Sequence, residues 1–240
     1  MPPPRGRGGI EGIEEKTQPE IQPAGAAPAP RGRFGALLVV LIASYVMSAL
    51  SRGRVIDALQ IVLFAGAALL ALRNSDAPRR VVRLALVALL GGTVIMVVLS
   101  ASLTAGDEGT GIANLWTGLI LLFAVGVIVR RVLSLGTVTI QSIYGAISAY
   151  LIIGLMFAAF YAAIDHLTGH AFFEPGRGDN TQTFQYFSFT TLTTLGYGDF
   201  VAVQNGGRAI AVLEALTGQI FLATLVARLV AAYRAPGGGN

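Results

Sequence analysis

Six long apolar runs fill more than half of this chain of 240 residues. A run of about 18 or more apolar residues is typical of a helix that crosses a membrane. Only 12% of the residues are charged, which is about half the fraction usual in a soluble domain. We therefore predict an all-α integral membrane protein with six transmembrane helices, at Phe34–Leu50, Val55–Leu72, Val81–Leu103, Ile112–Val129, Val138–Ile164 and Ala209–Tyr233.

The basic residues predict how these helices are oriented. If both termini are cytoplasmic, thirteen of the 17 Lys and Arg residues fall on the cytoplasmic side, and four fall outside. Cytoplasmic loops of membrane proteins carry such an excess of basic residues. We expect a multi-pass protein of the cell membrane with both termini in the cytoplasm. Residues 1–33, rich in Pro and Gly and without apolar periodicity, are predicted to be a disordered tail, and residues 235–240 a second, short tail.

A polar segment lies between the last two apolar runs. Thr181–Thr193 is amphipathic, but a helix of that length rises only about 20 Å, whereas the hydrocarbon core is about 30 Å thick. We predict a re-entrant helix that enters the membrane and returns. The residues that follow, Thr194-Leu195-Gly196-Tyr197-Gly198, must then be buried in protein or line a water-filled path, because non-helical backbone cannot face lipid. Their glycines allow backbone angles that point successive carbonyl oxygens the same way.

The run from Thr193 to Asp199, TTLGYGD, resembles the selectivity-filter signature of tetrameric potassium channels. The resemblance covers about Val138 to Tyr233 and implies a pore domain over residues 134–234, with an outer helix, a re-entrant pore helix, a filter and an inner helix. It implies a homotetramer in which each chain offers four carbonyl oxygens and the Thr194 hydroxyl to K⁺. Potassium would be the permeant ion, and we expect no other metal and no cofactor.

The resemblance also implies roles for residues around the filter. Asp199 would support the filter from behind, and Tyr186 and Phe187 would surround it with aromatic rings. Gly218 would be a hinge of the inner helix. The side chains implied to line the cavity on the inner helix are Gln219, Leu222 and Val226.

Glu214 is an acid inside the sixth apolar run. A carboxylate at membrane depth is costly unless it has a partner, so such acids are functional candidates. At Thr190 many potassium channels carry a glutamate that bonds the acid after the filter. We hypothesise that Glu214 replaces this support by hydrogen-bonding the pore helix, at Thr190 or Thr191. The alternative is that Glu214 faces the first four helices and pairs with a polar group there.

The first four helices, within residues 34–133, are predicted to form a transmembrane domain that is not a voltage sensor. A sensor needs several regularly spaced arginines on its fourth helix, and here the run carries only Arg130 and Arg131, at its cytoplasmic end. Topology alone explains those two. The domain is therefore interpreted as a support, a partner-binding bundle or a modulatory domain.

Other chemistries find little support in the sequence. There is no cysteine, which excludes disulfides and thiolate chemistry. His166 and His170 are four apart, but Gly169 interrupts the stretch, so we interpret them as solvated loop residues. No catalytic arrangement appears, and we predict that the protein is not an enzyme.

The leading hypothesis is a potassium-selective channel, weakly or not voltage-gated, whose partners are K⁺, the lipid bilayer and further copies of the chain, with no nucleic acid. The alternatives are a voltage-gated or weakly selective cation channel, and a non-conducting membrane scaffold with a channel-like fold.

Overall fold

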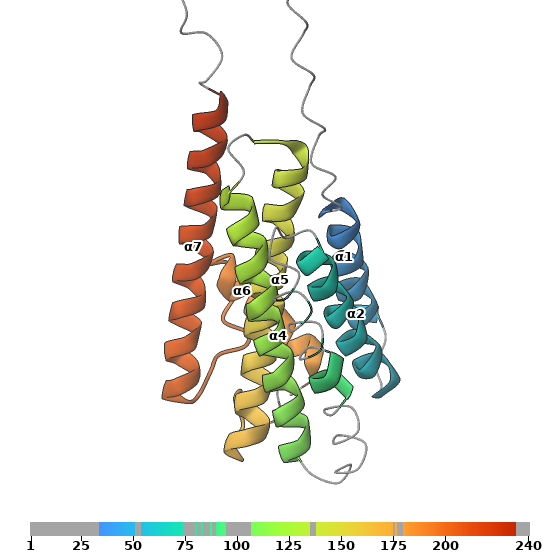
Figure 1. Ribbon diagram of the computed structural model, residues 1–240. Helices are drawn as coiled ribbons and strands as arrows, with labels where there is room; N and C mark the ends of the chain where they lie inside the picture. The colour runs from blue at the N-terminus through green and yellow to red at the C-terminus, as the bar shows by residue number, and fades with distance from the viewer. Residues whose placement is uncertain are drawn as a thin grey trace, which may run out of the picture. The chain divides into compact units, whose positions relative to one another are not determined.

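The computed structural model describes residues 34–50, 54–73, 80, 83, 87, 90–94, 107–134, 138–174, 176 and 180–233. This part of the chain is helical and contains no strand, in agreement with the predicted all-α class. Figure 1 labels its helices α1 (Phe34–Leu50), α2 (Arg54–Arg73), α4 (Asp107–Ser134), α5 (Ile140–Thr168), α6 (Thr181–Leu192) and α7 (Asn205–Tyr233). Residues 80, 83, 87 and 90–94 are helical as well.

Three of the described helices are long and apolar enough to cross a membrane: Glu108–Ser134 in α4, Ile140–Thr168 in α5 and Asn205–Ala231 in α7. At 1.5 Å per residue, each extends for about 40 Å, beyond a hydrocarbon core of about 30 Å. The fourth, fifth and sixth predicted spans are therefore confirmed as long apolar helices.

The other predicted spans remain open. Helix α1 is apolar but shorter, over Phe34–Ser48, and the crossings by α1 and α2 stay predictions. Most of the predicted span Val81–Leu103 lies outside the described residues, as do the predicted tails 1–33 and 235–240.

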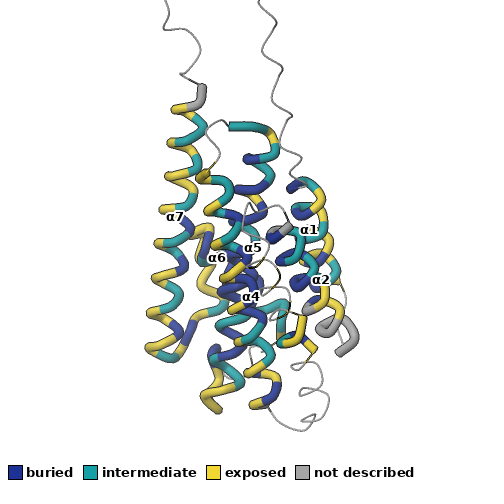
Figure 2. Tube along the Cα trace, in the orientation of Figure 1, coloured by how far each residue is buried: buried dark blue, intermediate teal, exposed yellow. Residues whose placement is uncertain are grey.

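Helix α5 is central to this arrangement, because it packs against α1, α4, α6 and α7. The core around it takes Leu41 from α1, Phe64 from α2 and Leu121 from α4, which meet Ile152 and Met156 of α5. Figure 2 shows buried residues along α5 and on the faces of the neighbouring helices that turn toward it. The helix that begins the predicted pore domain is thus also the main support of the N-terminal helices.

Helix α7 is covered on one side only. It packs on α5 and α6, and Arg228 donates a hydrogen bond of 2.7 Å to the carbonyl of Val132 near the end of α4. Most of its remaining surface is exposed (Figure 2), including Val212 at 60% and Ile220 at 65%. An apolar surface of this size needs a cover of lipid or protein.

Side-chain caps determine where α5 and α6 begin. Thr139 accepts a hydrogen bond from the N–H of Ser142 at 3.2 Å, and Ser142 accepts one from the N–H of Thr139 at 2.8 Å. This reciprocal capping box satisfies N–H groups that a helix start leaves unpaired. Asn180 caps α6 in the same sense, accepting from the N–H of Thr183 at 3.0 Å. Gly169, with a left-handed φ of 65°, ends α5.

Candidate functional site

Two glycines let α5 and α7 approach the short helix α6. A Cβ at Gly154 of α5 would lie 2.6 Å from a ring carbon of Phe189 in α6, and a Cβ at Gly218 of α7 would overlap the backbone carbonyl of Leu192. Helix α6 has 12 residues and rises about 18 Å, too little to cross a membrane. The predicted helix at Thr181–Thr193 is confirmed to within one residue, and its re-entrant path stays a prediction.

Helix α6 ends in a Schellman motif, in which N–H groups beyond the helix fold back onto its last carbonyls. The N–H of Leu195 donates to the carbonyl of Thr190 at 2.8 Å, and the N–H of Thr194 donates to the carbonyl of Thr191 at 2.9 Å. Thr194 has a φ of 58°, the left-handed conformation that this motif requires. Glycine usually occupies that position. A β-branched residue there is an outlier, at a cost of about 1–2 kcal/mol, and strain of this kind gathers at functional sites.

Positive φ angles continue at every second residue after Thr194. Gly196 has a φ of 49° and Gly198 a φ of 77°, so the segment Thr194–Gly198 is neither helix nor strand. Leu195 and Tyr197, between them, are 55% and 68% exposed. Because both side chains are large and apolar for most of their surface, they are suited to contact something beyond the described part of this chain.

Asp199, directly after this segment, is tied back to α6. The hydroxyl of Tyr186 hydrogen-bonds the Asp199 carboxylate, which raises the pKa of the phenol above its usual value and keeps it a donor. The same carboxylate accepts the N–H of Phe200 at 3.1 Å, and the rings of Tyr186 and Phe200 lie 5.8 Å apart. The acid therefore has a partner on α6, although Thr190 is not a glutamate.

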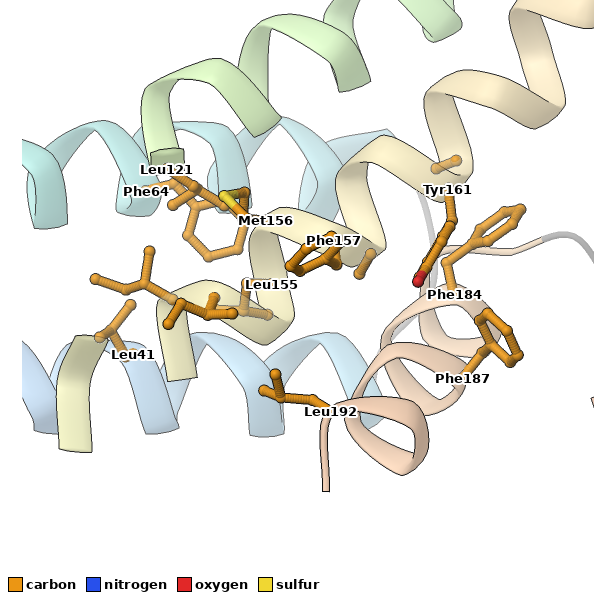
Figure 3. Packing of buried hydrophobic residues seen from close by; sticks show 14 of the residues in the cluster. Leu41, Phe64, Leu121, Leu155, Met156, Phe157, Tyr161, Phe184, Phe187 and Leu192 are labelled. Carbon is orange, nitrogen blue, oxygen red and sulfur yellow. The ribbon is translucent and has the colours of Figure 1, made fainter. Parts of the chain in front are cut away.

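Phe187, the second predicted aromatic residue, is buried on the other face of α6. Its ring centroid lies 5.1 Å from that of Tyr161, 5.7 Å from Phe172 and 5.3 Å from Phe173. Figure 3 shows Tyr161 of α5 extending toward Phe184 and Phe187 of α6. Aromatic packing thus connects α5, α6 and the loop at Phe172 and Phe173 behind the exposed segment.

Glu214 of α7 is 0% exposed and hydrogen-bonds two other helices. The hydroxyl of Tyr161 in α5 donates to its Oε2 at 2.6 Å, and Ser188 of α6 contacts its Oε1. The Ser188 hydroxyl also lies 2.6 Å from the carbonyl of Gly154 in α5. Side chains of α5, α6 and α7 therefore meet at one buried carboxylate.

These partners correct part of the sequence hypothesis. Glu214 does contact α6, the helix predicted to be the pore helix, but at Ser188 and not at Thr190 or Thr191. The hydroxyl of Thr190 donates instead to the carbonyl of Phe187, at 2.9 Å. Ser188 and Tyr161 were missed because α6 has no charged residue and α5 is apolar on nearly all sides, so the sequence does not indicate which face of either helix turns toward Glu214. The signal that could have identified Ser188 and Tyr161 is a hydroxyl group on an otherwise apolar helix face.

The predicted residues of α7 fall into two groups. Gly218 is buried against α6 at Leu192, where it allows the two helices to pack closely. Its role as a hinge stays a prediction. Gln219, next to it, donates from Nε2 to the hydroxyl of Thr194 at 3.1 Å. Leu222 and Val226 are exposed on this chain, and their lining of a cavity stays a prediction.

Helix α1 also reaches α6. Gln182 at the start of α6 donates from Nε2 to the carbonyl of Ser48 at 2.7 Å, and the ring of Tyr45 meets that of Phe189 edge-on at 5.3 Å. Of the described N-terminal helices, α1 therefore touches the helix that precedes the segment Thr194–Gly198.

The expectation that both histidines are loop residues is wrong for His166, which lies in the last turn of α5, whereas His170 is exposed beyond the cap at Gly169. The carboxylate of Asp165, beside His166, accepts the N–H of Phe172 at 2.6 Å. Within the described ranges, no group of three or more His, Cys, Asp or Glu residues could hold a metal ion.

Comparisons with known proteins match this same region. A family model described as "Ion channel" matches residues 145–235, from early α5 to just beyond α7. Protein LctB of Bacillus caldotenax is 33% identical over 107 residues, a match that covers 42% of this chain and 78% of that relative. The chain belongs to the ion channel family. No solved structure matches it.

The family match covers α5 from residue 145 onward, α6, the segment Thr194–Gly198 and α7. It identifies this channel as a membrane protein, consistent with its three long apolar helices. Helices α1, α2 and α4 precede the matched region.

Proposed function

We propose that this channel conducts K⁺ selectively and passively, as a homotetramer whose filter is Thr194–Gly198. The observation that carries the proposal is the positive φ at Thr194, Gly196 and Gly198. When every second residue has a positive φ, successive peptide units have the same orientation, so that their carbonyl oxygens can face one side. Rows of such carbonyls replace the hydration shell of K⁺ in potassium channels.

The chemistry of the segment fits a weakly hydrated cation better than a hard divalent one. Its ligands would be neutral carbonyls and the Thr194 hydroxyl, and the nearby acid, Asp199, is engaged by Tyr186 and Phe200. Divalent sites usually add carboxylates to the first coordination shell. A neutral oxygen lining therefore supports K⁺ as the permeant ion.

Uncovered surface supports a closed oligomer. One such segment cannot enclose an ion, and Leu195, Tyr197 and the apolar side of α7 are exposed on a single chain. Four copies around an axis would place four filter segments face to face and would cover these side chains, as cyclic symmetry allows. We further propose that opening is weakly or not voltage-gated, because α4 lacks regularly spaced arginines.

The test is ion flux into liposomes that contain the purified channel. With a K⁺ gradient we expect uptake driven by K⁺, and with an equal Na⁺ gradient far less. Gly196→Ala is the matched negative variant and should lose this flux. A Cβ at residue 196 would meet open space, so the loss would come from strain at the left-handed φ, about 1–2 kcal/mol per chain. Equal Na⁺ and K⁺ flux would contradict selectivity, and no flux of either ion would favour the scaffold.

A further inference from the structure

The Gln219 side chain joins the inner helix to the first residue of the exposed segment. Its Nε2 lies 3.1 Å from the hydroxyl oxygen of Thr194, although the two residues are 25 positions apart. Gly218, one residue earlier, brings α7 against the backbone of Leu192. Close packing at Gly218 therefore determines how near Gln219 comes to Thr194.

The hydrogen bonds of the Thr194 hydroxyl can be counted. A hydroxyl has one proton to donate and two lone pairs that accept. Its proton goes to the carbonyl of Thr193 at 2.7 Å, and one lone pair accepts from Gln219. A single lone pair is left, and the two existing bonds fix its direction.

The backbone beneath this hydroxyl is held as well. Thr194 is strained, with a φ of 58°, and such residues persist only where their surroundings determine the conformation. The carbonyls of Thr190 and Thr191 hold the backbone on the α6 side. Gln219 contacts the hydroxyl from α7. The rotation of the hydroxyl therefore depends on the position of this helix.

We propose that Gln219 is a positioning residue, which directs the free lone pair of the Thr194 hydroxyl toward the innermost cation site. This inference rests on the proposed function of Thr194–Gly198 as a potassium filter. It gives Gln219 a role beyond the predicted lining of a cavity: the amide determines how tightly the inner end of the filter holds a cation.

Barium is the probe for this site. Ba²⁺ is close to K⁺ in size and sheds its water more readily than the smaller, harder Mg²⁺ and Ca²⁺, so it can enter the same neutral oxygen sites, where its double charge strengthens its attraction to the oxygens. Its binding can be measured as the rise in thermal stability of the detergent-solubilised channel with Ba²⁺ concentration, because a ligand stabilises the folded state that binds it. This readout does not require a variant to conduct.

Gln219→Met removes the donor and keeps the length and helix propensity of the side chain. We expect Ba²⁺ binding to be at least fivefold weaker, because every chain of the tetramer loses its donor and the net worth of even one hydrogen bond, about 1 kcal/mol, corresponds to that factor. Gln219→Asn, whose amide is one methylene too short, should weaken it likewise and serves if the methionine variant does not assemble. Leu122→Met, at an exposed apolar position of α4 away from the proposed contacts between copies, is the control and should bind Ba²⁺ as the wild type does.

A double-mutant cycle separates positioning from a general change in α7. Thr194→Val removes the hydroxyl and keeps the branched shape, so Gln219→Met should add no further loss in that background. An unchanged Ba²⁺ affinity in both Gln219 variants would overturn the inference, and so would the same loss with Val at 194. If the wild type neither conducts K⁺ nor binds Ba²⁺, the proposed function fails. If it does both and Gln219→Met changes nothing, only the role of Gln219 fails.

Discussion

At the scale of single residues, Glu214 concentrates the polar contacts behind the exposed segment. Its carboxylate is 0% exposed and meets Tyr161 of α5 and Ser188 of α6. Polar groups at this depth are costly without partners, and here each carboxylate oxygen has one. The contact therefore fixes the position of α6 relative to the two long helices beside it.

We expect Glu214→Ala to destabilise the arrangement around α6. The substitution leaves the buried hydroxyl of Tyr161 without its acceptor, at a cost of about 1–3 kcal/mol. Under the proposed function, K⁺ currents should then inactivate faster than in the wild type. Glu214→Gln keeps an oxygen acceptor and should conduct with nearly unchanged inactivation. Patch recordings of reconstituted channels give both rates.

Two further variants make that comparison specific. Tyr161→Phe removes one of the same hydrogen bonds and should shift inactivation in the same direction by a smaller amount. Leu119→Ala, at an exposed position of α4 away from the proposed contacts between copies, should leave it unchanged. Wild-type selectivity and inactivation in Glu214→Ala channels would show that the carboxylate does not support the filter.

At the scale of elements, α6 is held in place by contacts from α1, α5 and α7. Gly154 and Gly218 let α5 and α7 approach it, and the hydroxyl of Tyr150 in α5 bonds its last carbonyl, at Leu192, at 3.3 Å. Gln182 and Phe189 connect it to α1. Each neighbouring helix thus constrains the direction in which the segment after α6 emerges.

Gly218→Ala should separate α7 from α6. The new Cβ meets the backbone carbonyl of Leu192, which has little room to yield, and overpacking of this kind costs about 1–3 kcal/mol. We expect a lower midpoint of thermal unfolding in detergent. Gly126→Ala is the matched control, because its Cβ on α4 would meet open space and alanine favours a helix. A Gly218→Ala channel with altered opening and wild-type stability would favour a hinge over packing.

Weak voltage dependence is the prediction that belongs to α4. Each charge moved through the membrane is worth about 2.3 kcal/mol per 100 mV, and α4 carries Arg130 and Arg131 only near its C-terminal end. We expect a shallow relation between conductance and voltage. A steep relation that Arg130→Gln and Arg131→Gln abolish would contradict this.

The sequence was sufficient for features that depend on length and local chemistry. Long apolar runs located α4, α5 and α7, and the amphipathic stretch located α6 to within one residue. It did not predict that α4 begins at Asp107 and ends at Ser134, because helical hydrogen bonds continue past the apolar residues. Contacts such as Glu214 with Ser188 depend on how two helices rotate against each other, which residues far apart determine together.

At the scale of the whole molecule, the described helices leave the site open on one side. The exposed side of α7 and the side chains of Leu195 and Tyr197 have no cover on the described part of the chain. The opposite side of α6 is closed by α5 and reached by α1. Because this site is packed against α5 on one side and exposed on the other, its exposed side is suited to contact other copies of the chain.

Native mass spectrometry of the channel in detergent should therefore give four times the chain mass of 25.0 kDa. Chemical crosslinking should produce a ladder that stops at four chains, with the denatured chain as the mass reference. A monomer or dimer that conducts K⁺ would contradict the proposed assembly.

The left-handed Thr194 places two opposing selective pressures on one codon. For thermal stability alone, glycine is the better residue at the end of α6, since it adopts a φ of 58° without strain. For a cation that needs a hydroxyl ligand, glycine is useless. Under the proposed function, selection for transport keeps threonine at this position despite its strain. A lineage that lost transport would be free to replace it with glycine.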